Sequence, residues 1–209
     1  MKKTPLHQLG EFSRGTPFTK KDLTDHGGAA ITYGQITHLA PIATTAPARL
    51  PEHTWNATRK AMPGDLLIAD TAMDIDGVGA AAAWAGDGPV AVDSHTIIFR
   101  TDIDTRLLAQ MLATSDVARQ KRRFITGVTA KRITVEHLGR IEVPVPEPDD
   151  GAEVFEKIRR LLAFKEEGTA QFRAYSQGRI RQLRFYRNEV LRFRELSGLA
   201  QDPTNHRTV

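Results

Sequence analysis

Prolines alternate with other residues in VPVPEPDDG, residues 143–151, and this stretch divides the chain. Pro144, Pro146 and Pro148 lack the amide hydrogen that helices and central strands require, so neither kind of element can run through them. The next 44 residues, 152–195, contain no proline, which permits long helices. We predict a domain over residues 1–150, a helical dimerisation and spacer region over 151–196, and a polar tail over 197–209.

The first part combines short strands with a few helices. Apolar or β-branched runs of strand length occur at residues 30–33, 65–68, 96–100 and 140–145, separated by Gly, Pro and Asp. Residues 104–115 carry apolar side chains at helical spacing behind Asp104, a suitable N-cap, and a short helical turn is expected after Thr134. The sequence therefore predicts an α+β fold, in which one mixed domain precedes a long C-terminal helix of coiled-coil type.

The helical region carries an apolar stripe. Its last four members follow one another at intervals of three, four and three residues, which is the rhythm of a coiled coil. Gly168 and an irregular interval before residue 180 leave two readings open, one continuous helix or two helices with a hinge. A helix cannot bury such a stripe alone, so we expect dimerisation through it. The stripe consists of Phe172, Tyr175, Ile180, Leu183, Tyr186, Val190 and Phe193.

Composition and charge narrow the class of protein. The chain has 209 residues, no cysteine and no apolar run near the ~20 residues that a bilayer span needs, so we expect no disulfide, no membrane segment and a cytoplasmic location. The formal net charge is +4, and the basic residues are concentrated. Residues 119–132 hold six cations and no carboxylate, which indicates a polyanionic partner.

Catalytic motifs are not evident in the sequence. Gly10 and Gly15 have the spacing of a phosphate-binding loop, but the lysine that should follow is missing. Asp70, Asp74 and Asp76 lie close together without the spacing of a calcium loop, so we interpret them as a surface turn. His95 lies at the start of an apolar run and is interpreted as a hydrogen-bonded structural histidine. We expect no active site, bound metal or cofactor.

Two cationic segments are candidates for contact with nucleic acid. The 119–132 segment combines its cations with a glycine and two threonines, which suit close approach to phosphates, although a solvated helix end followed by a turn would look the same. The 13–22 segment, SRGTPFTKKD, has a similar composition, and Gln35 is a candidate adenine reader. The candidate contacts are Arg14, Thr16, Thr19, Lys20, Lys21, Gln35, Arg119, Lys121, Arg122, Arg123, Thr126, Thr129, Lys131 and Arg132.

Six motifs occur in an order that resembles one repeat of the DNA-specificity subunit of Type I restriction-modification systems. They are LGEFSRGTPF, AITYGQI, MPGDLLIADT, VAVDSHTIIFRT, FITGVTAKRITVEHLGRIEVPVPEP and QLRFYRNEVLRF, and together they cover about residues 6 to 195. Each motif alone is weak, and the order makes the resemblance specific. The strongest part runs from Gly127 through the prolines into the helical region and ends at Tyr186 and Arg187.

The resemblance implies a non-catalytic subunit that recognises double-stranded DNA. In that family, a full-length subunit carries two target-recognition domains, and two long antiparallel helices set the distance between them. This chain has one such domain and one helical region. The resemblance therefore implies a half-size subunit that acts as a homodimer on an inverted-repeat site with a nonspecific spacer. The implied partners are methyltransferase subunits and, for cleavage, an ATP-driven restriction subunit. A different half-size chain as the second half, or a remnant that no longer assembles, also fits the sequence.

Two functions from other classes remain open at this stage. The chain could be a protein-interaction module whose helix makes the essential contacts. It could also be a metal-dependent nuclease that uses Asp70, Asp74 and Asp76. Loss of DNA retention after mutation of the two cationic segments, and a magnesium-dependent cleavage assay, separate these hypotheses from DNA recognition.

Overall fold

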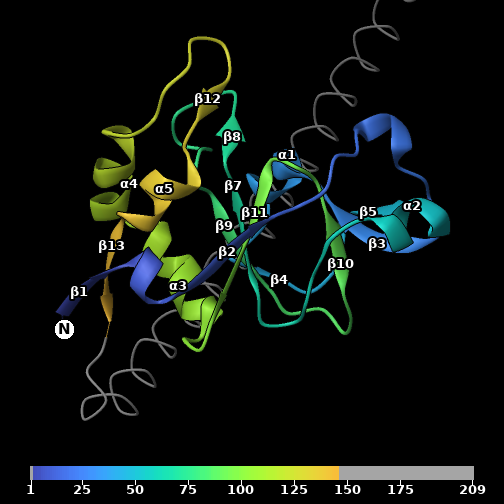
Figure 1. Ribbon diagram of the computed structural model, residues 1–209, viewed down its shortest axis with the longest axis horizontal. Helices are drawn as coiled ribbons and strands as arrows, with labels where there is room; N and C mark the ends of the chain where they lie inside the picture. Colours follow the sequence, from blue (N-terminus) through green and yellow to red (C-terminus); the bar gives the residue numbers. More distant parts are fainter. Residues whose placement is uncertain (1, 146–209) are drawn as a thin grey trace, which may run out of the picture. The chain divides into compact units, whose positions relative to one another are not determined.

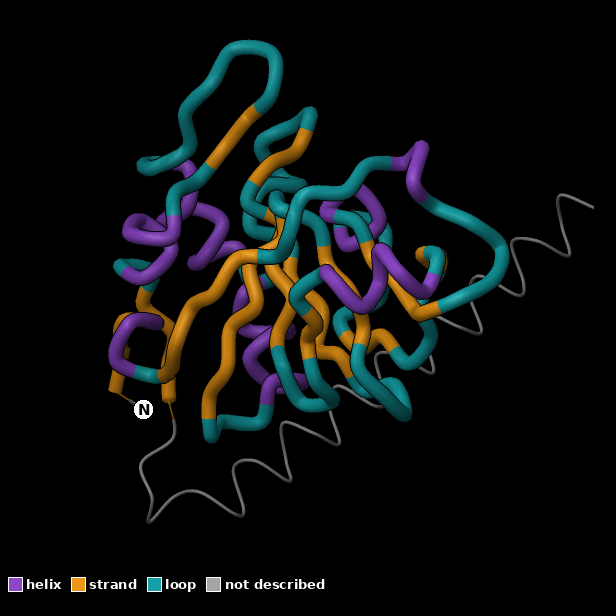
Figure 2. Tube along the Cα trace, turned by 45° about the vertical axis from the view of Figure 1, so that its right-hand side comes forward, coloured by secondary structure: helices purple, strands orange, loops and turns teal. Residues whose placement is uncertain are grey.

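The computed structural model describes residues 2–145 and shows a mixed α/β domain with several sheets and short helices, as predicted (Figures 1 and 2). The predicted long helix, with its apolar stripe from residue 172 to 193, lies outside the described residues, as does the polar tail. Within residues 2–145, no helix is both long enough and apolar enough to cross a bilayer.

The largest sheet has five strands and forms the centre of the domain. All four residues of its middle strand, LLIA, are buried, which explains why that strand is continuously apolar rather than alternating. Neighbouring strands are antiparallel except for the last pair, which is parallel. In spatial order the strands are β2 (Gly10–Arg14), β11 (Thr96–Thr101), β7 (Leu66–Ala69), β9 (Ala81–Trp84) and β4 (Ile42–Ala43).

A second sheet of four short strands packs against the first. Its central pair is parallel and its outer pairs are antiparallel. One hydrophobic cluster joins the two sheets: Ile31 and Val92 come from the smaller sheet, and Leu67, Trp84 and Ile98 come from the larger one. In spatial order the smaller sheet consists of β5 (Ala48–Leu50), β3 (Gly28–Ile31), β10 (Val90–Val92) and β6 (Lys60–Ala61).

Two further pairs of strands connect distant parts of the chain. The first strand, β1 (Lys2–Pro5), pairs antiparallel with β13 (Glu142–Val145), so that Lys2 lies opposite Val145. The strand β8 (Thr71–Ala72) pairs antiparallel with β12 (Lys131–Arg132). The second pair joins the loop after β7 to the 119–132 segment.

The helices are short, and several begin at the side chains that the sequence suggests. Asp104 accepts a hydrogen bond from the Arg106 amide at 3.0 Å, so the predicted N-cap is confirmed. The short helical turn expected after Thr134 is present as well, and Thr134 caps it by accepting from the His137 amide at 3.1 Å. The helical segments are η1 (Leu6–Gln8), η2 (Lys20–Asp22), α1 (Tyr33–Ile36), α2 (Glu52–Ala57), α3 (Thr105–Leu112), α4 (Ser115–Arg122) and α5 (Val135–Gly139), where η denotes a 3-10 helix.

The predicted strands at residues 65–68, 96–100 and 140–145 match β7, β11 and β13 to within one or two residues. The predicted strand at 30–33 ends earlier, at Ile31. Thr32 caps the helix α1 instead, because its backbone amide and hydroxyl both donate to the side-chain oxygen of Gln35, at 2.9 and 3.1 Å. The predicted helix over 104–115 is also shorter than expected, since α3 stops at Leu112 and α4 begins at Ser115.

Candidate nucleic-acid interface

The 119–132 segment folds as the end of a helix, a projecting loop and a short strand. The helix α4 ends at Arg122, and the loop over residues 123–130 leads into β12, rising above the rest of the domain in Figures 1 and 2. Thr126 and Arg132 close the loop through two backbone hydrogen bonds of 3.0 and 2.8 Å. Gly127 has a φ of +100°, a value that favours glycine, and a Cβ there would lie 2.0 Å from the Ala130 carbonyl oxygen.

Lys131 stabilises this loop from inside. Its ammonium group donates to the carbonyl oxygens of Gly127 and Val128 at 2.9 and 2.7 Å. The predicted DNA contact at Lys131 therefore competes with a structural role, because two of the three ammonium hydrogens already have acceptors in the loop.

Part of the positive charge of the segment has counter-charges that the sequence analysis did not anticipate. Arg119 pairs with Asp116 at 3.2 Å, and Arg122 pairs with Asp76 at 3.3 Å. The expectation of uncompensated charge is therefore wrong for these two arginines, because acids outside the segment supply the counter-charges. Arg123 and Arg132 are exposed, and within residues 2–145 neither guanidinium forms an ion pair.

Lys121 was predicted as a DNA contact, but the structure buries it. Its side chain is only 5% exposed, and its ammonium group donates to the Gly79 carbonyl oxygen at 3.2 Å. Burial lowers the pKa of Lys121, while the nearby Asp76 carboxylate opposes this shift. Lys121 faces inward because it lies on the same side of α4 as Val117, which is also buried. It anchors the loop after β8 and is not available to DNA in this structure.

Several polar side chains of the 13–22 segment also form hydrogen bonds or ion pairs within the domain. Arg14 pairs with the buried Asp70 and donates to the Ser94 carbonyl oxygen at 3.1 Å. The Thr16 hydroxyl accepts from the Arg59 amide at 2.8 Å, and Thr19 caps η2 together with Asp22. The exposed cations of this segment are Arg14, Lys20 and Lys21.

Gln35 does not occupy the position expected of a base reader. Its side-chain oxygen accepts both hydrogen bonds from Thr32 described above, which completes the capping box of α1. The amide face that would pair with adenine needs this oxygen as its acceptor. The capping pattern Thr-x-x-Gln at residues 32–35 was readable in the sequence and would have predicted both the helix and this role.

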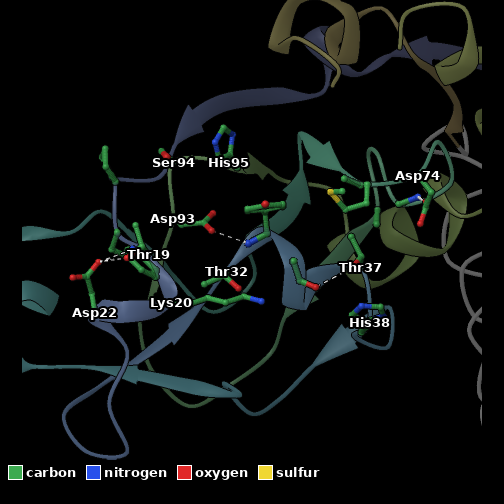
Figure 3. Close-up of a pocket in the computed structure, with 18 of the residues that line it drawn as sticks. Thr19, Lys20, Asp22, Thr32, Thr37, His38, Asp74, Asp93, Ser94 and His95 are labelled. Atoms are coloured by element: carbon green, nitrogen blue, oxygen red, sulfur yellow. Dashed lines mark hydrogen bonds between the residues drawn. The ribbon is translucent and has the colours of Figure 1, made fainter. Parts of the chain in front are cut away.

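A pocket of about 970 Å³ lies between the 13–22 segment and the loop after β8 (Figure 3). Lys20 and Asp22 line it from one segment, and Met73 and Asp74 line it from the other. Helix α1 and the turn before β11 complete its wall with Tyr33, Thr37, His38, Asp93, Ser94 and His95. The 119–132 segment does not line this pocket, but its strand β12 pairs with β8, and the loop after β8 forms one side of the pocket.

Asp70 and His95 connect the two sides of this surface. The Asp70 carboxylate, which is 6% exposed, lies 3.3 Å from the His95 ring nitrogen and also binds Arg14. The Asp70 backbone oxygen accepts from the Ile133 amide at 2.9 Å, which fixes the strand after the projecting loop. His95 is hydrogen-bonded, as we predicted.

The interpretation of Asp70 as part of a surface turn is wrong, because the residue is buried. Asp74 instead accepts from the Gly77 amide at 2.6 Å, and Asp76 pairs with Arg122. These different partners argue against the nuclease hypothesis. In the part of the chain that the structure describes, no group of three acidic, histidine or cysteine side chains is arranged to hold a metal ion.

Asp93 is a carboxyl group of the pocket whose pKa departs from its ordinary value. Burial raises its pKa, although hydrogen bonds from the Thr96 hydroxyl at 2.8 Å and the Tyr33 amide at 3.0 Å oppose the shift. Figure 3 shows the bond to Tyr33, which ties the start of α1 to the turn before β11. Asp93 therefore shapes the pocket wall. Sequence reasoning missed Tyr33 and His38 as pocket residues because no spacing rule relates them to the 13–22 segment.

The fold of the described domain is that of Type I restriction-modification S subunits. The structure superposes on the S subunit from M. genitalium with a TM-score of 0.55 at 13% identity, and on the HsdS subunit from Thermoanaerobacter tengcongensis with a TM-score of 0.50 at 16% identity. A chain from a solved structure concerning assembly of the type I R-M system gives 0.53 at 15% identity.

These three comparisons cover 79%, 81% and 83% of this chain, but only 39%, 37% and 42% of the respective solved chains. The chain therefore spans about two fifths of their length. No protein-family description and no curated protein matches the sequence. At these identities the likeness concerns the fold.

Proposed function

We propose that this protein is a non-catalytic DNA-recognition subunit of a Type I restriction-modification complex. One observation carries the proposal: in a fold shared with solved S subunits, the 13–22 cationic segment lines a pocket, and the 119–132 cationic segment pairs through β12 with the strand β8, which leads into the opposite wall of that pocket. Surfaces that carry exposed cations beside hydroxyl groups suit binding to a phosphate backbone.

The exposed residues divide into two roles in this proposal. Arg123, Arg132, Lys20 and Lys21 contact phosphates and fix the position of the duplex, because their charges are open to solvent. Thr126 and Thr129 on the projecting loop supply hydroxyls for phosphate or base edges. Lys121 and Gln35 support the surface without contacting DNA, since their polar groups serve the internal bonds described above.

The assembly we propose is based on the apolar stripe of the sequence. Two copies pair through residues 172–193, and their two domains read an inverted-repeat site with a nonspecific spacer. Methyltransferase subunits bind this dimer, and a restriction subunit joins the complex for cleavage.

DNA binding can be tested with a matched pair of charge variants. The full chain, with its methyltransferase partner, is titrated with selected and random duplexes at several salt concentrations. Arg123→Gln should weaken binding to all duplexes and reduce the salt slope by about one unit, because one phosphate contact is lost. Arg106→Gln on α3, at the opposite end of the domain from β12 in Figure 1, is the control and should leave both quantities unchanged. Equal affinity of the unmodified protein for every sequence would refute recognition.

The dimer is tested separately by Leu183→Glu, because a charge on the apolar seam is costly to bury. Light scattering should report half the molar mass of the unmodified protein. Methylome sequencing of cells with this variant should show loss of the palindromic methylation pattern. An unchanged mass would eliminate the helical interface while leaving DNA recognition by the domain intact.

A further inference from the structure

Val128 lies at the tip of the projecting loop and is 93% exposed. Within residues 2–145 it is the most open of four exposed large apolar side chains, the others being Met62, Met73 and Ile75. A single exposed valine is ordinary, and its position at the end of a stabilised loop is the unusual feature.

Several hydrogen bonds and one ring contact stabilise the loop around Val128. Lys131 bonds the carbonyl oxygens of Gly127 and Val128, and the two backbone bonds between Thr126 and Arg132 close the base of the loop. Phe124 stacks on His137 with 4.8 Å between ring centroids, which ties the start of the loop to α5. These contacts fix the backbone, yet leave the valine side chain in solvent. A preorganised apolar group loses little conformational freedom when it binds.

The charged side chains near Val128 indicate which kind of partner can bind the tip of the loop. Arg123 is the first residue of the loop and Arg132 follows the loop in β12. Both are exposed and without an ion pair among residues 2–145, and residues 119–132 contain no acid. An apolar tip between two free guanidinium groups matches a groove of duplex DNA, where phosphates border the base edges. In the major groove, the apolar group available for contact is the thymine methyl.

We propose that Val128 enters the major groove and contacts a thymine methyl group, making it a specificity-determining residue. Arg123 and Arg132 then bind the phosphates on either side of the groove. This inference rests on the proposed function and goes further, because it names the chemical group that the loop reads. The proposal also explains the hydrogen bonds of Lys131, since they hold the tip of the loop in place.

The test combines a protein change with a DNA change. The full chain with its methyltransferase partner binds a duplex carrying the site found by methylome sequencing, and thymines are replaced by uracil one at a time. Val128→Ala should lower affinity for this duplex by about tenfold, because two methyl groups leave the contact. One uracil replacement should lower the affinity of the unmodified protein by a similar factor and have no effect on Val128→Ala. Met62→Ala, which truncates an exposed apolar side chain outside the loop, is the control and should bind normally.

The outcomes separate the competing explanations. If Val128→Ala binds the selected duplex as well as the unmodified protein and keeps the same sensitivity to uracil, the contact does not exist. If that variant instead loses affinity for the methyltransferase subunit without DNA, the tip is a protein contact and the inference is overturned. If the unmodified protein does not distinguish selected from random DNA, the proposed function fails and the inference fails with it. Because Val128 is exposed, the substitution leaves the core intact, and an unchanged melting temperature checks this.

Discussion

Lys121 allows a quantitative test of how the 119–132 segment is attached to the domain. Its side chain is buried, its stem packs on Gly79, and its ammonium group donates to the Gly79 carbonyl oxygen. Lys121→Ala removes three methylenes from this contact at about 0.8 kcal/mol each, a loss of about 2.4 kcal/mol in the free energy of unfolding. Lys121→Met keeps most of the apolar stem and removes a buried charge, so we expect its stability to lie within about 1 kcal/mol of the unmodified protein at pH 7.

The pH dependence gives an independent check on the same residue. Burial lowers the pKa of Lys121 from its ordinary value of 10.5, with Asp76 opposing the shift. Between the lowered value and 10.5, the unfolded chain binds a proton that the folded chain releases, so this group adds stability as the pH rises. The added stability is complete above 10.5 and disappears as the pH falls through the lowered pKa. The unmodified protein should therefore gain stability relative to Lys121→Met as the pH increases through this window.

Both effects can be measured by urea denaturation followed by tryptophan fluorescence. The two tryptophans of the chain, Trp55 and Trp84, lie within the described domain and report its unfolding. If Lys121→Met is as unstable at pH 7 as Lys121→Ala, the charge and its hydrogen bond stabilise the loop after β8, and the packing argument is wrong. A stability difference between Lys121→Met and the unmodified protein that does not change with pH would contradict the pKa argument.

Three further outcomes are expected. Arg100 donates to both oxygens of the buried Asp65 carboxylate, at 2.8 and 2.6 Å, so Arg100→Gln should cost about 3 kcal/mol because it leaves that charge without its cation. Asp65→Asn should cost less, about 1 to 2 kcal/mol, since the exposed Arg100 can be hydrated, and urea titrations that give the reverse order would contradict this reasoning. Gly127→Ala should weaken DNA binding and accelerate amide exchange at Thr126 and Arg132 without lowering the melting temperature, because its Cβ distorts an exposed loop, and unaltered exchange would show that the loop tolerates the Cβ.

The sequence predicted the regular elements well where local chemistry determines them. The run Leu66–Ala69 is apolar because both faces of β7 are covered, and Asp104 and Thr134 cap helices through bonds to residues two or three positions ahead. None of these patterns predicted the order of the strands in the sheets. The pairing of β8 with β12 joins residues about 60 positions apart, and only tertiary packing selects it.

The charge environment of the candidate contacts could not be predicted from the sequence. A cation is free or neutralised according to which acid lies near it in space, and the acids here come from elsewhere in the chain. Asp76 reaches Arg122, and Asp70 reaches Arg14, although neither pair is close in sequence. Arg123 and Arg132 remain exposed without such partners among residues 2–145. Composition located the cations but could not distinguish those with internal partners from those that are available.

The pairing of β1 with β13 has an evolutionary consequence. Lys2 lies opposite Val145, so the polypeptide enters and leaves this domain at neighbouring points (Figure 1). A unit whose two ends meet can be exchanged as a whole between genes, because a single seam is all that must be rejoined. Recombination at that seam would replace this domain without changing the sequence that flanks it.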